Sequence, residues 1–160
     1  MRPILALVFA GLTALPAAAQ DAAESAPADS AEGTEALLAD LIRPADDTDL
    51  KDFIWTRRPL VVFADSPADP RYVQQMKNIR KRPEDLTERD VVVLTDTDPE
   101  ADSALREELH PRGFAIVLVG KDGKIYLRKP VPWDVREIGR VIDKMPMRQQ
   151  EIEDRRGGES

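Results

Sequence analysis

Three short, unbroken apolar runs constrain the fold of this chain more than any other feature. Leu60 to Ala64, Val91 to Leu94 and Phe114 to Val119 are rich in β-branched residues, as strands buried on both faces of a sheet are. Stretches with helical spacing separate these runs, and Asp69-Pro70 and Asp98-Pro99 have the residues typical of a helix N-terminus. Strands that alternate with helices in this way are expected to pair in parallel through right-handed crossovers.

The pattern continues after the third run. Asp122-Gly123 predicts a tight turn into a fourth strand over Lys124 to Arg128, antiparallel to the third. A last amphipathic helix is predicted from about Trp133 to Met145. In chain order the elements are β-α-β-α-β-β-α. We therefore expect an α/β domain with a mixed four-stranded sheet and helices on both faces, which is the thioredoxin-like arrangement.

Both ends of the chain differ from this ordered middle. Residues 1–19 have the features of an export signal, with an apolar run too short to span a bilayer and a cleavage site near Ala19. Residues 20–36 contain acids but no base, which predicts a disordered acidic linker. We expect the thioredoxin-like domain over residues 37–147 and a charged tail over residues 148–160. The protein is predicted to be periplasmic or secreted, with no membrane insertion after signal cleavage.

Charge and composition exclude several classes of function. The chain has a formal net charge of −7 and no cysteine. An acidic surface disfavours nucleic acid and anionic lipid as partners, because their phosphates require a cationic face. Without a thiol the chain cannot be a thiol oxidoreductase or a thiol peroxidase. No cofactor and no metal site are expected.

The turn after the first strand is the candidate binding site, because a ligand crevice of such sheets lies where a strand ends and a helix begins. Its six residues are Ser66, Pro67, Ala68, Asp69, Pro70 and Arg71. Ser66 and Asp69 are interpreted first as turn and cap residues, whose oxygens accept backbone N–H bonds.

Three functions remain open for this turn. The first is binding of a protein or peptide partner in the cell envelope, which requires an apolar patch beside the turn, with Trp55 or Trp133 as candidates. The second is an enzyme with cysteine-independent chemistry, which requires a closed pocket and a carboxylate with a shifted pKa. The third is a purely structural accessory domain. No catalytic residue is assigned.

Other polar residues have simpler interpretations. His110, the only histidine, precedes Pro111 and is interpreted as a solvent-exposed residue at a helix end. Basic groups such as Arg57-Arg58 are interpreted as solvated surface. One acidic series resembles a calcium loop but lacks the glycine that such a loop needs: Asp96, Asp98, Glu100 and Asp102.

Several motifs are shared with a known family. They are the runs Arg58 to Ala64, Glu88 to Val93, Val119 to Gly123 and Met145 to Glu151. In these motifs the chain resembles domain of unknown function 4174, a peroxiredoxin-like family of bacterial exported proteins and some animal extracellular matrix proteins. The resemblance spans about residues 50–151 and implies a thioredoxin-like fold without an established reaction.

The residues that carry this signature are interpreted as structural. We expect the polar ones after the last helix to bond terminal carbonyls or to form a clasp under the sheet, while a partner-binding role stays open. The signature residues are Lys121, Asp122, Gly123, Met145, Pro146, Arg148, Gln149 and Glu151.

Overall fold

The computed structural model describes residues 26–46 and 48–158. Within these residues five strands form one sheet in the order β1-β3-β2-β4-β5. The strands are β1 (Ile42–Pro44), β2 (Arg58–Phe63), β3 (Val91–Asp96), β4 (Ala115–Val119) and β5 (Ile125–Lys129). The helices are α1 (Ala26–Leu41), η1 (Leu50–Phe53), α2 (Pro70–Arg80), α3 (Pro83–Thr87), η2 (Pro99–Ala101), α4 (Ala104–Leu109), α5 (Val135–Ile142) and α6 (Pro146–Gly158).

The sheet is mixed, as predicted for a thioredoxin-like arrangement. Strand β3 is parallel to β2 and to β1, whereas β4 is antiparallel to both β2 and β5. The expectation that all helix-separated strands run parallel is wrong for β4. Helix α4 has six residues and spans only about 9 Å, less than half the length of a six-residue strand. It cannot carry the chain back along the sheet, so β4 starts where β3 ends and runs in the opposite direction.

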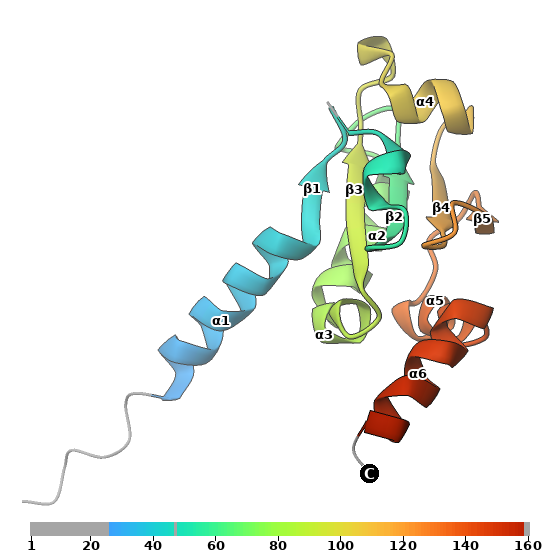
Figure 1. The fold of residues 1–160 in the computed structure, drawn as a ribbon. Helices are drawn as coiled ribbons and strands as arrows, with labels where there is room; N and C mark the ends of the chain where they lie inside the picture. Colours follow the sequence, from blue (N-terminus) through green and yellow to red (C-terminus); the bar gives the residue numbers. More distant parts are fainter. Residues whose placement is uncertain (1–25, 47, 159–160) are drawn as a thin grey trace, which may run out of the picture.

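The sheet has one strand more than the sequence predicts. Ile42–Pro44 pairs with Val93–Thr95 of β3 and forms an added outer strand. Helix α1 precedes it, so the described part of the predicted disordered linker is helical. Its last residue, Leu41, is buried against α3 and the sheet, which fixes the end of the helix, while its beginning projects away from the domain (Figure 1). The export signal and the start of the linker lie outside the described residues.

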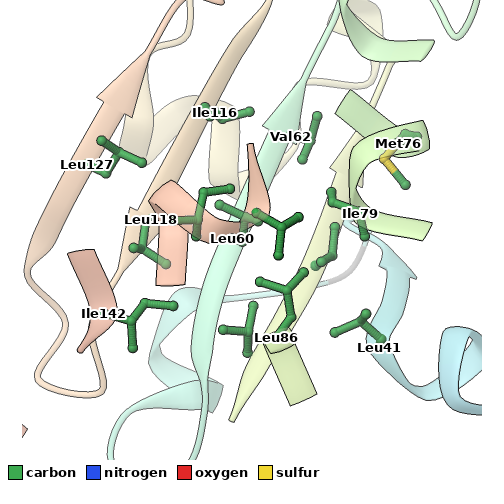
Figure 2. Close-up of a cluster of buried hydrophobic side chains, with 14 of the residues drawn as sticks. Leu41, Leu60, Val62, Met76, Ile79, Leu86, Ile116, Leu118, Leu127 and Ile142 are labelled. Carbon is green, nitrogen blue, oxygen red and sulfur yellow. The ribbon is translucent and has the colours of Figure 1, made fainter. Parts of the chain in front are cut away.

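Buried side chains pack on both faces of the sheet. On one face α2, α3 and α5 contribute Met76, Ile79, Leu86 and Ile142, which lie over Leu60 and Val62 of β2 (Figure 2). On the other face η1 and α4 pack over the alternate residues of the strands, with Leu50, Leu105 and Leu109 on Val61 and Phe63. The runs are apolar throughout because both faces of the sheet are covered.

The predicted helices differ from the observed ones mainly at their ends. The helix expected after Asp98-Pro99 is two short helices, because Asp102 between them takes a left-handed backbone conformation with φ of 44°. The predicted charged tail is helix α6, thirteen residues long in the described chain. None of the helices in the described ranges combines the length and the apolar character that crossing a membrane requires.

Candidate functional site

The six residues of the predicted site form one turn between β2 and α2. Asp69 accepts a hydrogen bond from the Arg71 amide at 2.8 Å and pairs with the Arg71 guanidinium, Nη2 to Oδ2, at 2.8 Å. These bonds from the Arg71 side chain and backbone lower the pKa of Asp69. Ser66 Oγ accepts from the Ala68 amide at 3.1 Å. Both side chains thus have the contacts of turn and cap residues.

The turn lines an open pocket of about 460 Å³. Its lining residues are Asp65, Ser66, Ala68, Asp69, Pro70 and Arg71. Among the described residues, the Ala68 amide is the hydrogen-bond partner of Ser66 Oγ, so no side chain is placed to activate the hydroxyl as a base would. Asp69 is held ionised rather than poised to accept a proton. The pocket is therefore suited to contact with a ligand more than to nucleophilic catalysis.

A larger pocket of about 570 Å³ adjoins this turn. Its lining residues fall into two groups, one apolar and the other basic or imidazole-bearing. The apolar group is Leu109, Phe114, Ala115 and Pro130, and the second group is His110, Arg112, Arg128 and Lys129. No acid is among them.

Two contacts show that the pockets are neighbours. The Arg71 guanidinium of the first pocket lies over the Phe114 ring of the second, 5.4 Å from its centre. Gly113 lies between Arg112 and Phe114 of the second pocket, and a Cβ atom built on it would be 3.4 Å from Oδ2 of Asp65 in the first pocket. In the sheet register Ala115 is paired with Phe63, so both pockets lie where β2 ends and β4 begins. We call the two together the crevice.

A buried ion pair fixes the strand ends beneath the crevice. Arg106 of α4 donates from Nη2 to the Ala64 carbonyl at 2.7 Å and from Nε to Asp96 Oδ1 at 2.8 Å. Asp96 also accepts from the Ser103 hydroxyl, and Asp98 caps η2. These contacts engage the first two carboxylates of the series that resembles a calcium loop. Over residues 26–46 and 48–158, no three His, Asp or Glu side chains are grouped as metal ligands.

The polar signature residues meet at the opposite end of the sheet. Glu151 Oε1 accepts from Arg58 Nη2 at 2.8 Å and lies 2.9 Å from Lys121 Nζ, which also pairs with Asp90. Although burial would raise the pKa of Glu151, the hydrogen bonds from Arg58 and Lys121 lower it to about 2. Arg58 is fully buried, which corrects its interpretation as solvated surface. We call these four residues the Glu151 cluster.

The remaining signature residues hold the turns and helices around this cluster. Arg148 is 2% exposed and lies 3.4 Å from both Glu151 and Glu88. Gln149 donates to the Asp143 carbonyl at the end of α5. Asp122 and Gly123 form the hairpin turn, Met145 is buried and Pro146 begins α6. These contacts favour the clasp interpretation.

The predicted apolar patch differs from the observed one. Trp55 is 70% exposed, but its amide bonds the Lys121 carbonyl at the end of the sheet away from the crevice. Trp133 is half-buried beneath Lys129, whose Nζ lies 4.7 Å from the ring centre. Two exposed valines follow lining residues of the crevice: Val73 comes two residues after Arg71, and Val131 follows Pro130.

The basic side of the crevice lies outside the six residues predicted as the site. Arg112 precedes the third apolar run, whereas Arg128 and Lys129 end the fourth strand. In an antiparallel pair the start of one strand adjoins the end of the next, and Ile116 is indeed paired with Lys129. The sequence therefore contained a sign of this basic surface, because the two strands have their basic residues at ends that lie side by side.

Comparison with known proteins gives a family and two structural neighbours. The family model described as Domain of unknown function (DUF4174) matches residues 49–151. A Plasmodium yoelii thioredoxin peroxidase I is similar at 17% identity, covering 64% of this chain and 80% of that chain, with a TM-score of 0.46. A Plasmodium yoelii Prx1a, modified at the N-terminus and forming an artifactual octamer, is 19% identical, with 64% and 81% covered and a TM-score of 0.44. No curated protein matches the chain.

Proposed function

The chain belongs to the family described as Domain of unknown function (DUF4174), and we propose that it is a thiol-free module that binds a protein or peptide partner in the crevice. The observation that carries this proposal is the pair of adjoining open pockets at the end of β2. One is formed by the turn over residues 66–71 and the other has an apolar floor with basic residues around it. Together they offer room for several consecutive residues of an extended chain.

The shape and the chemistry of the crevice support binding over catalysis. The charges of Asp69 and Arg71 are paired with each other, and the Ser66 hydroxyl accepts a backbone hydrogen bond within the turn. A binding surface benefits from this arrangement because its backbone is held rigidly before the partner arrives, which lowers the entropic cost of association. The Arg106 ion pair beneath the crevice serves the same purpose.

We propose that binding takes place outside the cytoplasm. This part of the proposal depends on the export signal predicted for residues 1–19. An exported domain without cysteine is not affected by thiol exchange in an oxidising compartment. The partner is accordingly expected in the periplasm or beyond the cell.

Site-specific photo-crosslinking in intact cells tests the proposal. A benzophenone side chain is introduced at Ala68, which is exposed in the crevice, and at Lys124 as a control, exposed in the hairpin at the other end of the sheet. We expect a discrete adduct from Ala68 and none of the same mass from Lys124. No adduct from either position, or the same adducts from both, would remove the support for a partner in the crevice.

A further inference from the structure

We propose that the larger pocket of the crevice selects an acidic peptide, in which one apolar side chain packs on the pocket floor and an adjacent carboxylate binds the surrounding cations. This inference rests on the proposed function and adds the chemistry of the partner. It is carried by two properties of the same pocket, its apolar floor and its uniformly basic rim.

The floor of the pocket fits one large apolar side chain. Leu109 and Phe114 are buried at its base, and Ala115 and Pro130 complete the apolar surface. The volume of about 570 Å³ lies within the range of small-ligand sites, roughly 300–1,000 Å³. Burial of an aromatic or branched side chain here supplies the apolar contribution to affinity.

The rim supplies cations that the protein leaves available. Arg112 is exposed and has no partner among the residues that the structure describes. Arg128 uses Nη1 to donate to the Leu109 carbonyl at 2.8 Å, which holds the guanidinium at the pocket. Its other N–H groups have no partner within residues 26–46 and 48–158. Lys129 is held over the Trp133 ring. Carboxylates bind arginine through two parallel hydrogen bonds, so this rim matches a carboxylate in geometry and in charge.

The position of the nearby acids determines how the peptide lies. Asp65 is exposed in the smaller pocket, and Asp69 there is neutralised by Arg71. An acidic peptide therefore places its carboxylate at the larger pocket, and its uncharged part over the turn at residues 66–71. The basic rim is opposite in sign to the formal net charge of the whole chain, which is −7.

A peptide array identifies the preferred chemistry directly. Glycine-serine peptides carrying every pair of residues at two central positions are probed with the labelled protein. We expect pairs of one large apolar residue and one Asp or Glu to bind most, and their Asn or Gln counterparts to bind about tenfold less. Equal signals for Glu and Gln peptides would overturn the proposal.

Substitutions locate the recognition in the pocket. Arg112→Ala combined with Lys129→Gln removes two of the three basic residues of the rim, leaves Arg128, and is expected to reduce the preference for acidic pairs. Arg80→Ala combined with Lys144→Gln removes the same charges from exposed positions that do not line either pocket, and is expected to leave the preference unchanged. A preference that is undiminished after the first pair of substitutions, or is reduced equally by the second, contradicts the assignment.

Failure of this inference and failure of the proposed function give different results. A discrete Ala68 adduct together with no acidic preference on the array means that the crevice binds a partner of other chemistry. The absence of both the adduct and any array signal removes the proposed function as well.

Discussion

Arg58 and Glu151 illustrate how single residues hold this fold together. Removing a cation from water is costly unless it is paired, and Arg58 has no exposed surface. Glu151 supplies the counter-charge from 93 positions further along the chain, and Lys121 and Asp90 complete the cluster. The sequence could not predict this burial, because an arginine next to another arginine is usually solvated surface.

Glu151→Gln is expected to destabilise the protein. The substitution keeps the shape of the side chain but leaves Arg58 and Lys121 without their shared anion. With the pKa of Glu151 lowered to about 2 from 4.5, and roughly 1.4 kcal/mol per pKa unit, the expected loss is up to about 3 kcal/mol of unfolding free energy. Urea unfolding followed by circular dichroism measures it.

Glu153→Gln is the matched control for this substitution. Glu153 lies on the same helix and is exposed. We expect its unfolding free energy to stay within about 0.5 kcal/mol of the parent protein. Equal effects of the two substitutions would mean that Glu151 stabilises the protein only through net charge.

The same cluster predicts a defined pH dependence. A carboxyl whose pKa is lower in the folded than in the unfolded protein stabilises the fold above the unfolded pKa of about 4.5, and loses this effect as the pH falls towards 2. The difference in unfolding free energy between the parent protein and Glu151→Gln should thus be constant above pH 5 and shrink below it. A difference that does not change between pH 6 and pH 2.5 would contradict the assigned pKa.

Individual residues of the candidate site were predicted unevenly. Ser66 and Asp69 have the contacts expected of turn and cap residues, because these depend on neighbours two positions away. The basic residues of the larger pocket come from separate segments that only the sheet brings together. Pockets of this kind depend on tertiary structure, which local patterns do not contain.

At the scale of elements, the buried strands were predictable and the outer elements were not. Strands β2, β3 and β4 each contain an unbroken apolar run, a pattern with few alternatives. Strand β1 is only three residues long and includes Pro44, so it has no comparable pattern. Helix α6 lies where the sequence predicts a charged tail, because local pattern does not distinguish the buried Arg148 and half-buried Glu151 from the exposed charges around them.

Truncation distinguishes the two parts of α6. A chain ending at Glu153 keeps the Glu151 cluster, and we expect its thermal midpoint to match that of the full chain. A chain ending at Gln150 lacks the anion and is expected to lose at least as much stability as Glu151→Gln. Equal stability of the two truncated chains would show that α6 does not act as a clasp.

The hairpin between β4 and β5 has a strict requirement for glycine at position 120. A Cβ atom there would lie 2.6 Å from Cε2 of the Tyr126 ring, which is itself held by a 2.9 Å bond to Asp122. Gly120→Ala is therefore expected to lower the free energy of unfolding by about 1–3 kcal/mol, as overpacking of a side chain does. A Gly120→Ala variant with unchanged stability in chemical denaturation would contradict the close approach.

Gly33→Ala, at an open helical position, should raise the free energy of unfolding by up to about 1 kcal/mol.

At the scale of the whole molecule, the two ends of the sheet differ in how their charged residues are paired. The end where β2 begins holds the buried Glu151 cluster, with its charges paired within the protein. The end where β2 finishes holds the open crevice, in which Arg112 has no partner among the described residues. The chain has no thiol, and the turn after β2 forms the smaller pocket of the crevice.

Both pockets of the crevice are expected to bind one partner. The most direct measurement is the yield of the Ala68 photo-adduct in cells carrying Arg112→Ala with Lys129→Gln, compared with cells carrying Arg80→Ala with Lys144→Gln. We predict that the yield of the adduct is reduced with the first pair of substitutions and unchanged with the second. An adduct of undiminished yield in the first pair would show that the basic pocket has no part in binding, and would contradict this account.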